Sequence, residues 1–269
     1  MSLEKCNDGA HDQKTSVQGI LAVRLILYYS KNIHMEYHRF FSIIIPAYNE
    51  EKLIGATLDH LLAQIYPLDK FEIIVVVNGS NDRTFDKARK YTRDNVKVYN
   101  LKQASVSRSR NFGLSVISKN TNWIIFLDAD TYFKNLFLEE LNIYLDKYPK
   151  VSYGTTTIQS DVNTRASQFW YWYINWTDQS LKILHRIHIV RKDLALQVNY
   201  DENLIRTEDL HYGKDLSKIG KYFFMPTKNV VSSARRFENK GYLKMLFFNL
   251  MVGILPKKIN YSKGWEVIR

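Results

Sequence analysis

The segment FSIIIPAYNEE, residues 41–51, decides the fold, because an apolar run ends there in a polar cluster. Residues 41–45 have the continuous apolar character of a strand that is buried on both faces. Asn49 is predicted to cap a helix with Glu50 and Glu51 in its first turn, and apolar side chains then recur at helical spacing from Ile54 to Ile65. A buried strand followed directly by a helix is the unit from which parallel α/β sheets are built.

The same alternation continues along the chain. Further strands are predicted at residues 71–77, 96–99, 123–127, 151–158, 187–191 and 222–225, and further helices at 84–92, 105–118, 135–148 and 208–219. Strands and helices that alternate at this spacing predict parallel βαβ units, so the fold class is α/β. The aromatic-rich segment 168–177 forms either a wall for a bound sugar or part of the core.

Composition limits the class of protein. With 269 residues, 45% of them hydrophobic, the chain can build one large α/β domain with an appendage. The net charge of +11 suits nucleic acid, an anionic membrane surface or anionic small ligands. No run of five Lys or Arg occurs, which argues against a nucleic-acid partner. The single cysteine, Cys6, rules out an intrachain disulfide and a multi-cysteine zinc site.

No segment has the pattern of a signal peptide or of a membrane-spanning helix, which needs roughly 20 apolar residues. Residues 242–258 come nearest, with an apolar run that ends in Pro256, Lys257 and Lys258. This segment either lies in a membrane interface or packs on the domain as a helix. We therefore expect a cytoplasmic protein, with peripheral contact at the inner face of the cell membrane as the alternative that residues 242–258 leave open.

Polar clusters follow three of the predicted strands, at residues 46–50, 78–80 and 128–130. Because the carboxyl ends of parallel strands meet at one edge of a sheet, these clusters should converge on one ligand site. Asp128 and Asp130 repel each other unless a cation joins them, and a hard divalent ion shares such oxygen ligands with phosphates. An isolated Asp-X-Asp is more often an ordinary turn, but its place beside the other clusters favours a ligand site.

Five segments, in order, resemble the inverting family 2 glycosyltransferases of GT-A fold: FSIIIPAYNEE, EIIVVVNGSNDRT, SRSRNFGL, WIIFLDAD and RKDLALQVNYDENLIRTEDLHYGKDLSKIGK. The resemblance runs from about residue 41 to 222. It implies a Rossmann-like mixed sheet flanked by helices. It also implies a nucleotide-sugar donor, with a UDP-sugar favoured, a saccharide or lipid-linked acceptor, and a divalent metal, Mn²⁺ or Mg²⁺.

The resemblance also assigns roles to individual residues. It places Pro46, Ala47, Tyr48 and Glu50 around the nucleoside, Asn78 at the base, Asp128 at the ribose or diphosphate, Asp130 at the metal, and Asp209 as general base. Asp209 would take the proton of an acceptor hydroxyl, which attacks the anomeric carbon from the face opposite the nucleotide and so inverts it.

Further candidate site residues have both a functional and a purely structural interpretation. Arg110 and its neighbour Asn111 either border the donor site or lie on a solvated helix face. Arg235 and Arg236 are either near a phosphate or in a solvated turn. Glu208, with Asp209, also suits the first turn of a helix without any catalytic role.

The sequence departs from the family at two places. Val77-Asn78 stands where the family usually has Asp-Asp or Asp-Asn, and Val198-Asn199-Tyr200 stands where it often has Gly-Gly-Phe. The Asn78 amide can both donate to and accept from a pyrimidine edge, so uracil still fits.

By domain, residues 1–38 are expected to be a poorly ordered extension, with Met35 a candidate natural start. Residues 39–228 form the catalytic domain, with a nucleotide-binding half at about 39–132 and an acceptor half at about 133–228. Residues 229–269 form a C-terminal helical extension.

The sequence lacks the motifs that two other classes of nucleotide-dependent enzyme require. A dehydrogenase needs a Gly-x-Gly-x-x-Gly segment, which is missing, and a nucleotidyltransferase needs a Gly-rich phosphate loop with a cation near the first strand. The remaining alternative is a non-catalytic nucleotide-sugar or glycan-binding protein of the same fold.

Overall fold

The structure is a computed structural model that describes residues 37–204, 207–242 and 244–245. The chain divides into two compact units between His38 and Arg39, and the architecture below is that of the unit beginning at Arg39. The expectations for residues 1–36, including Met35 as the start, lie outside the described residues. So does the expectation for 246–258, the main part of the segment proposed for the membrane interface.

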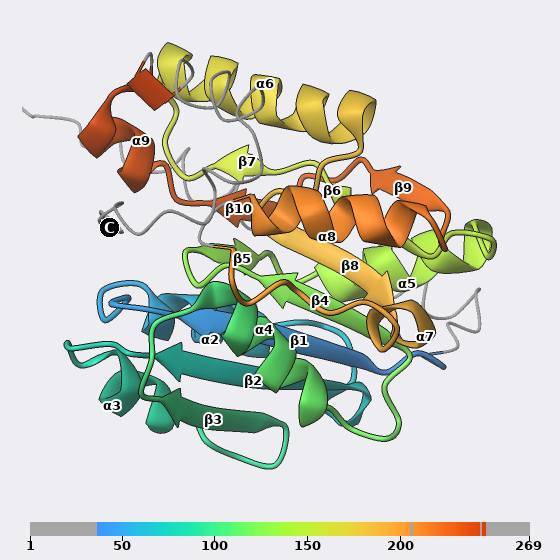
Figure 1. Cartoon of the computed structure of the whole chain (residues 1–269), viewed down its shortest axis with the longest axis horizontal. Helices are drawn as coiled ribbons and strands as arrows, with labels where there is room; N and C mark the ends of the chain where they lie inside the picture. Colours follow the sequence, from blue (N-terminus) through green and yellow to red (C-terminus); the bar gives the residue numbers. More distant parts are fainter. Residues whose placement is uncertain (1–36, 205–206, 243, 246–269) are drawn as a thin grey trace, which may run out of the picture. The chain divides into compact units, whose positions relative to one another are not determined.

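Within the described residues, the main sheet has seven strands in the order β3-β2-β1-β4-β8-β6-β9 (Figure 1). Its strands are β1 (Phe41–Ala47), β2 (Phe71–Asn78), β3 (Val96–Leu101), β4 (Trp123–Leu127), β6 (Tyr153–Thr156), β8 (Ile187–Arg191) and β9 (Tyr222–Met225). A smaller sheet has the order β5-β10-β7, with β5 (Thr131–Phe133), β7 (Gln159–Ser160) and β10 (Val230–Ser232).

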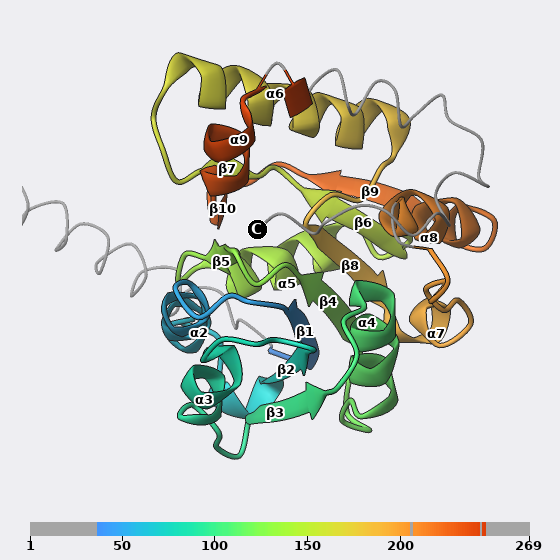
Figure 2. The same cartoon turned by 60° about the vertical axis from the view of Figure 1, so that its left-hand side comes forward.

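The helices connect and cover these strands. They are α2 (Ile54–Leu62), α3 (Thr84–Arg89), α4 (Val106–Ser115), α5 (Phe137–Lys147), α6 (Arg165–Leu181), α7 (Lys192–Ala195), α8 (Glu208–Ser217) and α9 (Arg235–Lys240), with the 3-10 turn η1 (Leu68–Lys70). Helices α2 and α3 lie on one side of strands β1 to β3 and α4 lies on the other (Figure 2). Strands β1, β2 and β4 are therefore buried along their whole length, as their continuous apolar runs predict.

The sheet changes direction after β4. Strands β1, β2, β3 and β4 are parallel, whereas β8 runs antiparallel to both β4 and β6. In the β4–β8 register, Leu127 at the end of β4 lies opposite Ile187 at the start of β8. The residues that precede β8 are thereby brought next to Asp128, at the edge where the parallel strands end.

The predicted helix cap at Asn49 is wrong. Helix α2 begins at Ile54 with Leu53 as its N-cap, and no acidic residue lies in its first turn. Asn49 instead has a left-handed backbone with φ of 53°, and its Oδ1 accepts a hydrogen bond from the backbone N–H of Asn81. An N-cap residue is normally extended, so this backbone is unsuited to capping, and the side chain joins the β1 and β2 loops instead.

The aromatic segment is a helix of 17 residues, α6. The Thr164 side chain caps it by accepting a hydrogen bond from the backbone N–H of Ser167. Trp170, Tyr171 and Ile174 lie on its buried face. The core explanation of this segment therefore holds for that face.

In the part of the chain that the structure describes, no helix is long and apolar enough to cross a membrane.

Helix α4 can approach the sheet closely because residue 113 is glycine. A Cβ atom built on Gly113 would lie 2.4 Å from Cγ2 of Ile44 in β1. Gly113→Ala should therefore lower the free energy of unfolding by about 1–3 kcal/mol, since the helix must shift on a packed core. Urea denaturation followed by circular dichroism measures this.

Gly213→Ala is the matched control, because it makes the same change inside α8. There the added Cβ has only ordinary contacts, the nearest at 3.7 Å. This variant should be neutral or up to about 1 kcal/mol more stable, from helix propensity. Equal destabilisation of the two variants would contradict the proposed packing constraint.

Candidate functional site

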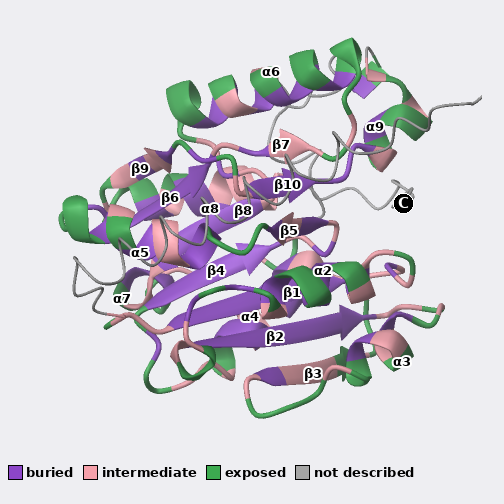
Figure 3. Cartoon of the chain, turned by 180° about the vertical axis from the view of Figure 1, so that it is seen from behind, coloured by how far each residue is buried: buried purple, intermediate pink, exposed green. Residues whose placement is uncertain are grey.

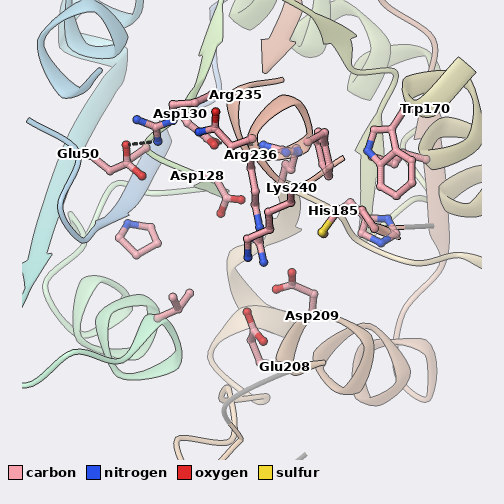
Figure 4. A pocket seen from close by; sticks show the side chains of 18 of the residues that line it. Glu50, Asp128, Asp130, Trp170, His185, Glu208, Asp209, Arg235, Arg236 and Lys240 are labelled. Carbon is pink, nitrogen blue, oxygen red and sulfur yellow. Dashed lines mark hydrogen bonds and ion pairs between the residues drawn. The ribbon is translucent and has the colours of Figure 1, made fainter. Parts of the chain in front are cut away.

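The polar clusters after β1 and β4 converge on one pocket at the carboxyl edge of these strands, as expected, whereas the cluster at residues 78–80 does not line it (Figure 4). Among the predicted residues, those that line it are Pro46, Glu50, Arg110, Asp128, Asp130, Glu208, Asp209, Arg235 and Arg236. Other lining residues come from α6, from the turn before β8 and from α9, and they include Trp170, Ile174, His185, Arg186 and Lys240.

Arg110 is the centre of the charge network in this pocket. Its guanidinium is buried, with 2% of the side chain exposed. Nη1 donates to Oδ1 of Asp209 at 2.5 Å and lies 3.6 Å from Glu208, and Nη2 donates to Oδ1 of Asp128 at 3.2 Å. The guanidinium carbon also lies 5.0 Å from the centre of the Tyr200 ring. The solvated-face explanation of Arg110 is therefore wrong.

Asn111, the next residue on α4, fixes the loop before α8. Its Nδ2 donates to the carbonyl of Tyr200 at 2.9 Å, and its Oδ1 accepts from the Tyr200 N–H at the same distance. This paired contact holds Tyr200 against Arg110, so Asn111 supports the site without lining the pocket.

A second arginine holds Asp130. Nη1 of Arg186, in the turn before β8, donates to Oδ1 of Asp130 at 3.1 Å and to Oγ of Ser232 at 2.5 Å. The Arg186 carbonyl accepts from the N–H of Asp128 at 3.0 Å, which ties the turn to the Asp-X-Asp segment. Near Asp130, Arg235 donates to the buried Glu50 at 2.8 Å (Figure 4). Arg235 is therefore not confined to a solvated turn.

The two aspartates after β4 fit a divalent ion. Burial raises the pKa of Asp128, and the nearby charge of Asp130 raises it further against the lowering effect of Arg110. A cation placed between the two carboxylates would relieve that repulsion. Within the described residues, no three His, Cys, Asp or Glu side chains are grouped to hold a metal. A hard ion that takes its remaining ligands from a diphosphate and water suits such a two-carboxylate set.

Glu208 and Asp209 begin α8 and differ in protonation. Burial, and next the charge of Asp209, raise the pKa of Glu208 to about 7. Burial also acts to raise the pKa of Asp209, but Arg110 leads the opposing effects and the pKa ends below its ordinary value. At neutral pH Asp209 is therefore ionised, while Glu208 is partly protonated.

His188 lies beneath Asp209, with Nε2 at 3.4 Å from Oδ1. Burial lowers the pKa of His188 to about 3, so the imidazole is neutral and the contact is no ion pair. Its Nδ1 is hydrogen-bonded to the hydroxyl of Tyr200. Arg110 is thus the charge that keeps Asp209 ionised, and His188 fills the space behind it.

Thr207, the N-cap of α8, has a left-handed backbone with φ of 58°. Such a conformation is costly for a β-branched residue, and strain of this kind is found where a functional group must be held in place. Here the two residues that follow it directly, Glu208 and Asp209, both line the pocket.

Three predicted residues lie beside the pocket. Ala47 ends β1, Tyr48 follows it, and Asn78 ends β2, but none of them lines the cavity. Asn78 is buried, and its Nδ2 has no hydrogen-bond partner. A buried amide donor of this kind is available to an acceptor atom of a ligand.

Arg186, His185 and His188 were not predicted from the sequence. All three are in the segment LHRIHIVR, residues 184–191, which leads into β8. Their proximity to Asp128 depends on β8 being antiparallel to β4, and the alternation of strands and helices contains no signal for that reversal.

The chain is similar to known proteins in sequence and in fold. The sequence profile described as "Glycosyl transferase family 2" matches residues 42–202, more than half of the chain. The poly(ribitol-phosphate) beta-N-acetylglucosaminyltransferase TarS of Staphylococcus aureus is 30% identical over 109 residues, which are 40% of this chain and 19% of that protein. The chain therefore matches only about a fifth of the length of this relative.

A Methanococcus voltae protein matches over more of its length. It is a dolichyl N-acetyl-alpha-D-glucosaminyl phosphate 3-beta-D-2,3-diacetamido-2,3-dideoxy-beta-D-glucuronosyltransferase. It is 23% identical over 249 residues, which are 84% of this chain and 77% of that protein.

Solved structures share the fold. S. aureus TarS 1–349 in complex with UDP-GlcNAc has a TM-score of 0.59 at 22% identity, covering 72% of this chain and 58% of that chain. A mannosyltransferase from Pyrobaculum calidifontis in complex with GDP-Man and Mn²⁺ has a TM-score of 0.57 at 17% identity, covering 84% and 71%. At these identities the likeness concerns the fold alone, and it confirms the predicted mixed sheet flanked by helices.

The raised pKa of Glu208 makes stability depend on pH. Between pH 4.5, the ordinary pKa, and about 7, the folded protein holds a proton that the unfolded chain has lost. Stability from this group is therefore present below pH 4.5 and is lost as the pH rises through 7. Glu208→Gln should not show this loss. Between pH 4.5 and 8 its free energy of unfolding should come to exceed that of the parent protein by up to about 3 kcal/mol.

Urea denaturation at pH 5, 6, 7 and 8 with a chelator present measures this difference. Glu238→Gln is the control, because Glu238 is an exposed carboxylate on α9. A Glu208→Gln curve parallel to the parent curve at all four pH values would show that Glu208 has no raised pKa.

Proposed function

The chain belongs to the glycosyltransferases of family 2, and on this premise we propose that it transfers a sugar from a nucleotide-sugar donor to an acceptor hydroxyl. The observation that carries the proposal is the shared pocket of Asp128, Asp130 and Asp209 (Figure 4), in which Arg110 forms ion pairs with both Asp128 and Asp209. A donor diphosphate at Asp128 and Asp130 places the sugar between them and Asp209.

A UDP-sugar is the favoured donor. The unpartnered amide of Asn78 lies at the end of β2, beside Tyr48 and the end of β1, and an amide there suits the carbonyl edge of uracil. TarS was solved in complex with UDP-GlcNAc, whereas the mannosyltransferase was solved in complex with GDP-Man and Mn²⁺. The fold therefore accommodates both nucleotides, and Asn78 supports UDP for this chain.

A divalent ion, Mn²⁺ or Mg²⁺, would be held by Asp130 and the donor diphosphate, with Asp128 beside it at the ribose or diphosphate. When bound, it would neutralise the charge of the departing nucleotide. Arg186 holds Asp130 by one oxygen and so fixes the direction of the carboxylate. Arg235 and Arg236, which lie near Asp130, would supply positive charge to the diphosphate (Figure 4).

Asp209 is the proposed general base. Because Arg110 keeps it ionised, it can take the proton of the acceptor hydroxyl as that oxygen attacks the anomeric carbon. The bond from the anomeric carbon to the nucleotide diphosphate breaks as the new glycosidic bond forms on the opposite face, and the configuration inverts. Glu208, with its raised pKa, is partly protonated at neutral pH and leaves Asp209 as the ionised carboxylate of the pair.

A saccharide or lipid-linked acceptor is the proposed second substrate. The Methanococcus voltae relative is named for a dolichyl-phosphate-linked sugar, and its match extends over 84% of this chain. Trp170 and Ile174, whose side chains are mostly buried in the core, also line the pocket and add an apolar and aromatic surface that suits a sugar.

The alternative is a non-catalytic binding protein of the same fold. Such a protein would bind the donor without turning it over. The presence of Asp128, Asp130 and Asp209 in one pocket favours the enzyme.

Asp209→Asn should lower the rate of transfer by about 10²–10⁴-fold, the usual contribution of a general base, while donor affinity stays within about twofold. UDP release from a UDP-sugar, measured with a panel of saccharide and polyprenyl-phosphate acceptors, follows the rate, and calorimetry follows donor binding. Asp215→Asn is the control, an exposed carboxylate on the same helix that is paired with Lys218. Undiminished turnover in Asp209→Asn would remove the assignment.

Donor and metal can be tested by thermal stability. UDP-, GDP- and TDP-sugars are compared with and without Mn²⁺, and a UDP-sugar with Mn²⁺ should raise Tm most. A ligand at 100 times its Kd adds about 2.7 kcal/mol. Asp130→Asn should lose the Mn²⁺-dependent part of this rise, whereas Asp215→Asn should keep it. A larger rise with a GDP-sugar, or none with Mn²⁺, would contradict the donor or the metal.

A further inference from the structure

The outer face of α6 has three large aromatic side chains that take no part in the pocket. Phe169, Trp172 and Trp176 are 54%, 60% and 48% exposed. Their spacing of three and four residues places them on one face of the helix. The ring centres of Phe169 and Trp172 are 5.7 Å apart, so these two side chains form one aromatic surface. Figure 3 shows this outward side as exposed and the underside as buried.

The opposite face of the same helix is fixed in the protein. Trp170 and Ile174 line the pocket, and the hydroxyl of Tyr171 donates to the carbonyl of Ser232 at 2.9 Å. Trp170 packs on Phe237 of α9 with 4.7 Å between ring centres. The exposed aromatic side chains are therefore presented by a helix that is anchored from below.

The exposed charges of α6 itself and of the residue that follows it have one sign, and the nearest exposed acid along the chain, Asp161, precedes the helix and accepts a hydrogen bond from the N–H of Ala234. The only acidic residue of α6 is Asp178, which is fully buried. Arg165 begins the helix and Lys182 follows its last residue, and both are exposed. The exposed side of α6 is thus apolar in the middle and cationic at both ends.

From this combination we propose that the outer face of α6 is a docking surface for an anionic lipid bilayer. Tryptophan side chains prefer the membrane interface, and an amphipathic helix with a basic margin lies in the plane of that interface. Each Lys or Arg close to an anionic surface strengthens binding by about fivefold. The net charge of +11 acts in the same direction.

A second copy of the chain fits this face less well. In a two-fold contact the same patch faces itself, so an antiparallel pair of α6 helices would bring Arg165 of one copy towards Lys182 of the other. Like charges that meet in an interface oppose association. An anionic bilayer instead meets both cations with opposite charge.

Docking through α6 would hold the pocket close to the lipid surface, because Trp170 and Ile174 line it from the other side of the same helix. This consequence rests on the proposed lipid-linked acceptor. The docking itself depends only on α6 and can be tested without any turnover.

The test is flotation of the full chain with vesicles of phosphatidylcholine alone and of phosphatidylcholine with phosphatidylglycerol. The parent should float with the anionic vesicles, and Trp172→Ser with Trp176→Ser should reduce the partition coefficient at least about tenfold. The matched control is Leu68→Ser with Ile143→Ser, which removes two side chains of similar exposure, 57% and 48%, from η1 and α5. Arg165→Gln with Lys182→Gln should weaken binding to the anionic vesicles alone.

Circular dichroism and the thermal shift with a UDP-sugar show whether each variant is folded with an intact donor site. A tryptophan double variant that binds the sugar but not vesicles supports docking, whatever the outcome for catalysis. A parent chain that does not float overturns the proposal, as does unchanged flotation of the tryptophan double variant. Sedimentation that reveals a lipid-free dimer lost in that variant would assign the face to a second copy instead.

Discussion

A single buried guanidinium holds the pocket together. Arg110 comes from α4, and its partners Asp128 and Asp209 are 18 and 99 residues further along the chain. Carboxylates taken out of water are costly unless a positive charge and hydrogen bonds accompany them. Because Arg110 satisfies acidic groups from β4 and α8 at once, these two elements must meet at α4. The position of α4 in turn depends on Gly113, whose lack of a side chain lets the helix lie against Ile44.

The antiparallel strand β8 brings a second cation, Arg186, into the pocket. Only an antiparallel β8 brings the residues before it to the end of β4, and Arg186 then reaches Asp130 while its carbonyl holds the N–H of Asp128. Each aspartate of the Asp-X-Asp segment is thus oriented by its own arginine. That separation is consistent with the proposed division of roles, in which Asp130 binds the metal and Asp128 faces the donor.

The sequence was informative where one local property determines structure. The strands at 123–127, 187–191 and 222–225 have the predicted bounds, because apolar runs between polar clusters leave little choice of register. Convergence of Glu50 and Asp128 followed from the parallel strands, whereas Asp209 was assigned to the same site by the family resemblance. The prediction that Asn49 caps a helix was wrong because its side chain forms a hydrogen bond with the β2 loop instead. Arg186 and His188 could not be placed, since their importance arises from strand pairing that is distant in sequence.

Because Arg110 contacts the neighbouring carboxylates Glu208 and Asp209 unequally, the two have different protonation states. Both carboxylates are drawn into the same pocket, and burial acts to raise the pKa of each. Arg110 forms its short hydrogen bond with Asp209 and lies 3.6 Å from Glu208. Asp209 is therefore ionised, and the proton shared by this part of the pocket is held by Glu208. The neutral His188 behind Asp209 adds no competing charge. A general base in this pocket must be ionised and close to the Asp-X-Asp segment, and Asp209 meets both conditions. The proton on Glu208 limits the negative charge that the donor diphosphate must approach.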